Sequence, residues 1–101
     1  MNGERIARTT DPDGREVVFD EGSYRHLEER RPVFLGYIDV ILETVARPDH
    51  REPDPEPDRE RFYRENVLDP GRWLRVVVDF EETPARVVTA LVQISDPRRT
   101  R

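Results

Sequence analysis

The sequence predicts a small α+β domain in which a helix pair packs on one face of a small antiparallel sheet. Two apolar runs, Trp73–Phe80 and Arg86–Ile94, are rich in valine and are joined by a short polar segment that contains Pro84. Branched side chains favour strands, and apolar runs of this length bounded by turn residues are typical of an antiparallel pair. In Val33–Arg47, apolar residues recur every three or four positions, which indicates an amphipathic helix.

Composition limits the protein to one modest domain. The chain has 101 residues, of which 35% are hydrophobic and 39% are charged, so its surface must be strongly charged. It contains no cysteine, which excludes disulfides and thiolate metal sites. The formal net charge of −5 argues against a general affinity for nucleic acid, although it leaves room for a local basic patch.

Three segments are expected along the chain. Residues 1–14 are polar and end in the turn signal Asp11-Pro12-Asp13-Gly14, so we expect a flexible N-terminus. Residues 15–95 form the single domain, and residues 96–101 form a loose basic tail. No apolar run is long enough to cross a bilayer, and the first residues lack the apolar part of a signal peptide. We therefore expect a cytoplasmic protein.

The first half of the domain is predicted to hold one strand and two helices. Arg15–Asp20 is the strand. Ser23 is expected to be the N-cap of the first helix, which ends before Pro32 because proline disfavours helical geometry in the preceding residue. Tyr24 and Leu27 lie three residues apart and are expected to face the core. The amphipathic helix described above follows.

The second half begins with a segment unlike the rest of the chain. Asp49–Arg59 has three prolines that alternate with acidic residues, so we expect an exposed, partly extended loop. Glu60–Asn66 returns to strand character. In this strand Phe62 is expected to point inward, with Arg61 and Tyr63 on the outward side.

The register of the last two strands follows from their apolar sides. The residues expected to face the core are Leu74, Val76, Val78, Phe80, Val88, Ala90, Val92 and Ile94. This register leaves Arg75 and Thr89 together on the opposite, open face of the sheet. We expect any functional site to lie near these two residues. The predicted element order is strand, helix, helix and three strands (β-α-α-β-β-β).

Several short motifs carry a resemblance to a known group of proteins. In chain order they are Tyr24-Arg25-His26-Leu27, Tyr37-Ile38-Asp39-Val40-Ile41, Thr44-Val45-Ala46-Arg47-Pro48-Asp49, Phe62-Tyr63-Arg64, Leu74-Arg75-Val76-Val77-Val78 and Val88-Thr89-Ala90. Together, over roughly Val17 to Ile94, they resemble the bacterial and phage domains of the barnase–EndoU–colicin–RelE nuclease superfamily. The resemblance implies a RelE/barnase-like α+β domain over residues 15–95. Members often carry a second histidine shortly after the first, where this chain has Arg31-Pro32.

The resemblance also implies a function. It is that of a metal-independent ribonuclease-like domain that cleaves RNA, as in a toxin of a toxin–antitoxin or phage-related system. RNA, which the ribosome presents to some toxins, is the implied partner, together with an antitoxin or another protein.

Cleavage of RNA without a metal needs a base for the 2′-hydroxyl proton, an acid for the leaving oxygen and cations for the phosphate. The residues expected to be catalytic are His26, Arg75, Thr89 and Tyr63. His26 titrates near neutral pH and is the acid–base candidate, while Tyr63 is expected to stack on a base or to donate a hydrogen bond. The residues expected to bind RNA are Arg61, Arg64 and Arg31.

Each of these residues also has a purely structural interpretation. His26 is then a hydrogen-bonded helix residue, and Tyr63 packs within the sheet. Arg61 and Arg75 pair across strands with acidic neighbours such as Glu65 or Asp79, and Thr89 reflects strand propensity alone. On this interpretation the domain is a non-catalytic member of the same fold that binds a protein partner.

A metal site is a third interpretation, because His50 lies among Asp49, Glu52 and Asp54. The alternating prolines make the spacing of these side chains irregular, and a single histidine among loop carboxylates is usually solvated. We therefore expect neither a metal nor a cofactor.

Overall fold

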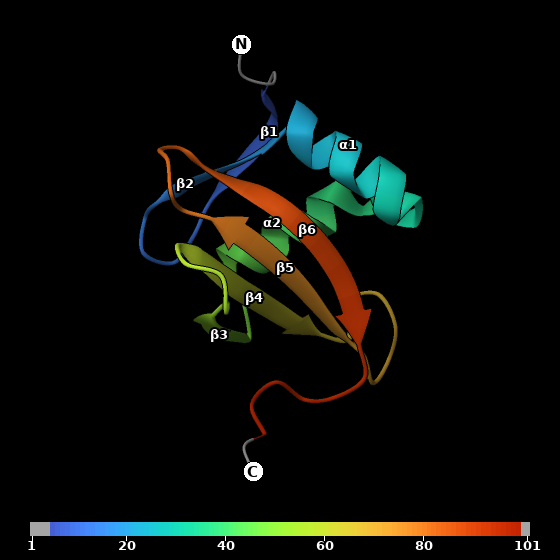
Figure 1. The fold of residues 1–101 in the computed structure, drawn as a ribbon. Coiled ribbons are helices and arrows are strands. Elements are labelled where there is room, and N and C mark those ends of the chain that lie inside the picture. The colour runs from blue at the N-terminus through green and yellow to red at the C-terminus, as the bar shows by residue number, and fades with distance from the viewer. Residues whose placement is uncertain (1–4, 100–101) are drawn as a thin grey trace.

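The computed structural model describes residues 5–99 and has an α+β fold, as predicted. One sheet lies against two α-helices and a short 3-10 helix (Figure 1). The elements in this range are β1 (Arg5–Thr10), β2 (Glu16–Asp20), α1 (Glu21–Arg30), η1 (Pro32–Tyr37), α2 (Ile38–Ala46), β3 (His50–Pro53), β4 (Arg59–Glu65), β5 (Trp73–Asp79) and β6 (Ala85–Gln93).

Within the described residues the sheet has six strands in the order β1-β2-β6-β5-β4-β3. Neighbouring strands are antiparallel except β2 and β6, which run parallel and pair through Val17 with Ala85 and Val18 with Arg86. The sheet is therefore mixed, and the prediction of a purely antiparallel sheet with four strands is wrong. β2, the first predicted strand, lies beside β6, the last one. The chain passes through both helices and three more strands before it returns to pair with β2. No helix within residues 5–99 has the length and apolar character needed to cross a bilayer.

Two of the six strands are absent from the sequence prediction. The sequence predicts a flexible N-terminus over residues 1–14, but Arg5–Thr10 pairs with β2 as β1; Met1–Glu4 lie outside the described residues. The sequence also predicts an exposed loop over Asp49–Arg59, but its first part pairs with β4 as the edge strand β3. Pro53 ends this strand, and proline is tolerated at an edge.

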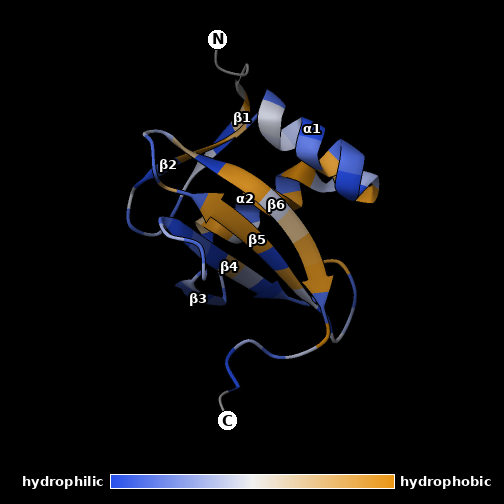
Figure 2. Cartoon of the chain, viewed as in Figure 1, coloured by the Kyte–Doolittle hydropathy of each residue, from blue (hydrophilic) through white to orange (hydrophobic). Residues whose placement is uncertain are grey.

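The core lies between the helices and one face of the sheet. Its buried residues are Val17, Phe19, Leu27, Phe34, Ile41, Val45, Phe62, Leu74, Val76, Val78, Ala85, Val87 and Ala90. The predicted register of β5 is confirmed, because Leu74, Val76 and Val78 are all buried there. Figure 2 shows the resulting apolar character of β5 and β6.

The register of β6 differs from the prediction at its first residues. Val77 pairs with Thr89, but the next residue of β5, Val78, pairs with Val87, so Val88 is the extra residue of a bulge. Val87 therefore faces the core in place of Val88. Beyond the bulge the predicted alternation holds within β6: Ala90 is buried, Val92 is partly buried against the core, and Thr89 stays on the other face. The predicted core position of Ile94 is wrong, because β6 ends at Gln93 and Ile94 is 70% exposed.

Both helices begin differently from the prediction. Asp20, rather than Ser23, is the N-cap of α1, and Ser23 is the third helical residue of a capping box in which the two side chains bond to each other's backbone N–H. The Ser23 hydroxyl also donates a 2.6 Å hydrogen bond to the carbonyl oxygen of Val87, so α1 lies along β6. Leu27 is buried as predicted, but Tyr24 is 38% exposed and does not face the core.

The second predicted helix, Val33–Arg47, is divided in two. Its first part is the 3-10 helix η1, which contains Pro32 at its start and Gly36 near its end, and α2 begins only at Ile38. Val33 is 70% exposed. The apolar face of α2 is as predicted, since Ile41 and Val45 are buried in the core.

Candidate functional site

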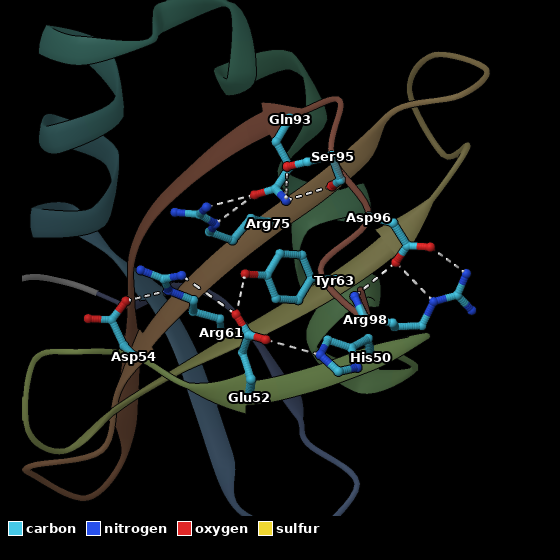
Figure 3. A network of polar contacts seen from close by, with 10 residues as sticks. All are labelled: His50, Glu52, Asp54, Arg61, Tyr63, Arg75, Gln93, Ser95, Asp96 and Arg98. Carbon is cyan, nitrogen blue, oxygen red and sulfur yellow. Dashed lines mark hydrogen bonds and ion pairs between the residues drawn. The ribbon is translucent and has the colours of Figure 1, made fainter. Parts of the chain in front are cut away.

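The face of the sheet turned away from α2 carries a network of polar side chains (Figure 3). We call it the open face. Strand pairing defines its members, because residues opposite each other in a ladder lie on one face: His50 pairs with Tyr63, Glu52 with Arg61, Tyr63 with Arg75, Arg75 with Leu91, Val77 with Thr89 and Trp73 with Gln93. The prediction that Arg75 and Thr89 share the face away from the helices is confirmed.

Tyr63 lies at the centre of this network and is only 1% exposed. Its hydroxyl donates a 2.9 Å hydrogen bond to Oε2 of Glu52. Its ring lies between His50, at a centroid distance of 5.6 Å, and Trp73, at 6.4 Å. Burial and the bond to Glu52 raise the pKa of Tyr63. The ring is thus enclosed by its neighbours, and Tyr63 does not offer the expected surface for stacking on a base.

Glu52 connects Tyr63 to two basic side chains. Its Oε1 lies 3.1 Å from Nε2 of His50, and its Oε2 lies 3.6 Å from a terminal nitrogen of Arg61. Burial alone would raise the pKa of Glu52, but the hydrogen bonds from Tyr63 and His50 outweigh it and lower that pKa. Glu52 is therefore ionised at neutral pH.

Arg61 and Arg75 face the same side but have different partners. Arg61 donates a 2.7 Å hydrogen bond from Nε to Oδ1 of Asp54, so a carboxylate balances its charge. Arg75 donates two hydrogen bonds, of 2.6 and 3.1 Å, to the amide oxygen of Gln93. Within residues 5–99, no carboxylate lies within ion-pair distance of Arg75. Arg75 keeps an unbalanced positive charge in the middle of the open face.

Thr89 and Gln93 line the β6 side of Arg75. The hydroxyl oxygen of Thr89 is buried and has no hydrogen-bond partner among the described residues. The side-chain nitrogen of Gln93 donates a 2.8 Å hydrogen bond to the carbonyl oxygen of Ser95, which links Arg75 to the C-terminal segment. The guanidinium carbon of Arg75 lies 5.9 Å from the centroid of the Tyr63 ring.

His26 and His50 belong to elements that lie against different strands of the sheet. It belongs to α1, which lies along β6, whereas His50 belongs to the outer strand β3. Strands are about 4.8 Å apart, so β6 and β3 are separated by roughly 14 Å. Burial lowers the pKa of His26, and the nearby charges of Arg30, Arg31 and Arg86 lower it further. No hydrogen bond or ring contact of the described residues joins His26 to Arg75, Tyr63 or Thr89.

The remaining two expected RNA-binding residues lie elsewhere. Arg64 pairs with Leu74 in the ladder and therefore faces the helices, where its guanidinium approaches Glu43 of α2 at 3.8 Å. Its Nε is buried without a partner in the described structure. Arg31 follows α1 and lies near His26, whose pKa its charge lowers.

Sequence reasoning missed His50 and Glu52 as members of the open face. The signal is present in retrospect: the two residues are two positions apart, as are Arg61 and Tyr63, and both spacings suit one face of a strand. The three prolines that follow led to the prediction of a loop instead of a strand. Within residues 5–99, no group of three or more histidine and acidic side chains is arranged to hold a metal ion.

Comparison of the chain with protein-family models, curated proteins and solved structures finds no match.

Proposed function

We propose that this chain is a metal-independent ribonuclease-like domain with a RelE/barnase-like arrangement, and that it acts on RNA at the open face. The observation that carries the proposal is the position of Arg75. Its guanidinium has an amide as hydrogen-bond partner instead of a carboxylate, so it can exchange that bond for one to a phosphate.

The surroundings of Arg75 suit this role. Gln93 holds the guanidinium in place, and the enclosed ring of Tyr63 lies against it at 5.9 Å. A cation that is already positioned stabilises the charge that develops on phosphate during cleavage without having to reorganise. The resemblance of the motifs from Tyr24 to Ala90 supports the same activity, either in a toxin of a toxin–antitoxin system or in a phage-related protein.

A second candidate function is favoured by the charge of the open face. The network in Figure 3 contains three arginines, Arg61, Arg75 and Arg98, and three carboxylates, Glu52, Asp54 and Asp96. Its formal charge is balanced, and RNA binding generally requires excess positive charge. A non-catalytic domain that binds a protein partner through this face, such as an antitoxin, fits that balance.

Cleavage of RNA by the Arg75→Ala variant in a translation extract separates the two functions. The extract is needed because the ribosome presents the RNA to some toxins. The wild-type protein is expected to cleave RNA in the extract, and Arg75→Ala to be slower by about a hundredfold, the scale of losing one such donor. EDTA is added only in a parallel assay on purified RNA, because intact ribosomes need Mg²⁺.

Arg25→Ala is the matched control, since Arg25 is an exposed arginine on α1 whose side chain pairs with Glu21. Circular dichroism checks that both variants remain folded. RNA that stays intact both in the complete extract and as purified RNA, the latter with and without divalent cations, would favour the protein-binding function instead.

A further inference from the structure

We propose that His50, held by Glu52, is the acid–base group of the open face and takes the proton from the 2′-hydroxyl of the RNA. This inference rests on the proposed function. It replaces His26 with a histidine that the fold, and not the sequence spacing, brings next to Tyr63, across that ring from Arg75.

The geometry of His50 leaves one ring nitrogen ready for a substrate. Its Nε2 lies 3.1 Å from Oε1 of Glu52, and a carboxylate accepts, so Nε2 carries the hydrogen. In the neutral ring Nδ1 then has the free lone pair. No described residue bonds to Nδ1, and this atom is not among the buried unpaired ones. The side chain of His50 is 25% exposed, so Nδ1 is open to a ligand.

Glu52 is suited to position His50 rather than to act as the base itself. Both of its carboxylate oxygens have partners, one in His50 and the other in the Tyr63 hydroxyl. The hydrogen bonds that lower its pKa also make it a weak base. A carboxylate that orients a histidine and stabilises its protonated form is a recurrent arrangement in proton transfer.

His50 and Arg75 also flank the same ring. The Tyr63 ring centroid lies 5.6 Å from the His50 ring centroid and 5.9 Å from the guanidinium carbon of Arg75. A proton acceptor and a phosphate-binding cation therefore lie on either side of one rigid, buried side chain. His26 lacks such a connection, because it belongs to α1, which lies along β6, three strands from β3.

The 2′-oxygen forms a bond to phosphorus while the bond from phosphorus to the 5′-oxygen breaks, and the 2′-hydroxyl proton passes to Nδ1 of His50. The 5′-oxygen takes a proton from solvent water, and the imidazolium of His50 returns its proton to the resulting hydroxide. Arg75 stabilises the negative charge on the phosphate oxygens throughout the step.

The test compares His50→Ala, Glu52→Gln and Arg75→Ala for cleavage of RNA in a translation extract between pH 5 and 8. His50→Ala is expected to be slower by at least about a hundredfold, with a flat pH profile, and to recover activity when imidazole is added. Glu52→Gln is expected to slow cleavage less than His50→Ala does, because glutamine keeps an acceptor for Nε2 of His50 but lacks the carboxylate charge. Arg25→Ala is the control.

The outcomes separate the inference from the function on which it rests. If Arg75→Ala slows cleavage but His50→Ala does not, the inference is overturned and the proposed function stands. The same conclusion follows if His26→Ala, and not His50→Ala, flattens the pH profile and is rescued by imidazole. Loss of activity in His50→Ala without rescue overturns the acid–base role. If the wild-type protein leaves RNA intact, the proposed function fails, and the inference fails with it.

Discussion

The Tyr63 hydroxyl on β4 donates a 2.9 Å hydrogen bond to the Glu52 carboxylate on β3, and Tyr63 is only 1% exposed. β3 is an edge strand of four residues that pairs only with β4. The bond therefore attaches the side chains of this short strand to the body of the sheet. It also fixes Glu52, and through Glu52 it fixes His50, relative to the rest of the open face.

Tyr63→Phe is expected to lower the free energy of unfolding by about 1–2 kcal/mol, because a charged, partly buried acceptor loses its donor while the ring remains. Urea denaturation at pH 7 measures this change. Tyr24→Phe is the matched control, since the Tyr24 side chain is 38% exposed, and it should be nearly neutral. Equal changes in the two variants would show that the buried bond contributes nothing.

Stability is expected to fall in acid as the carboxylates of the open face gain protons. Burial alone would raise the pKa values of Glu52 and Asp54, but hydrogen bonds from Tyr63 and His50 to Glu52, and from Arg61 to Asp54, lower both. A group whose pKa is lower in the folded state stabilises the fold above its unfolded-state pKa. That stabilisation is lost as pH falls below the unfolded-state values of 4.5 and 3.8.

Urea denaturation at pH 7, 5 and 3 tests this dependence. The free energy of unfolding should change little between pH 7 and 5 on account of these two groups and should fall towards pH 3. The double variant Glu52→Gln, Asp54→Asn should lose less stability than the wild type between pH 5 and 3. Identical losses would mean that carboxylates elsewhere govern the acid transition.

Asp11→Ala is expected to destabilise the protein by about 3 kcal/mol, since a buried carboxylate with three donors is lost. Oδ1 of Asp11 accepts from the backbone N–H groups of Asp13 and Arg15, and Oδ2 accepts from Nε of Arg15 at 2.8 Å. Thermal unfolding measures the change, with Asp69→Ala, in an exposed turn, as the control. A small effect would show that the β1–β2 turn forms without this side chain.

The sequence reveals those parts of the fold that depend on local pattern. The apolar runs that form β5 and β6 predict their pairing, and the face of Arg75 follows from strict alternation along β5. Alternation fails at Val88, because a bulge is a property of two strands together. Ser23 has the expected side chain for a cap, but Asp20 provides the same chemistry three residues earlier.

The two edge strands, β1 and β3, are the strands that the sequence does not predict. The open face extends to one of these edges, because His50 and Glu52 lie on β3. Arg5–Thr10 and His50–Pro53 contain few apolar residues, so nothing local marks them as strands; pairing with β2 and β4 makes them so. His50 thus appears in the sequence as a loop residue and in the structure as a neighbour of Tyr63. Arg64 shows the reverse case: it belongs to a predicted strand but faces the helices.

The last prediction concerns the C-terminal segment, which the sequence presents as a loose tail; of that tail, residues 96–99 lie within the described structure. The guanidinium carbon of Arg98 lies 4.9 Å from the Trp73 ring centroid, and Asp96 holds that guanidinium at 2.9 Å. Trp73 is 2% exposed and is the only tryptophan in the chain, so tryptophan fluorescence reports on the surroundings of this one ring.

Arg98→Ala is expected to make Trp73 more accessible to acrylamide, because the cation no longer lies over the ring. Arg98→Lys should give an intermediate result, since lysine keeps the charge but lacks the planar group that stacks. Arg25→Ala on α1 should quench as the wild type does. If Arg98→Ala also quenches as the wild type does, then the strands, and not residues 96–99, shield Trp73, and this segment is as loose as its composition suggests.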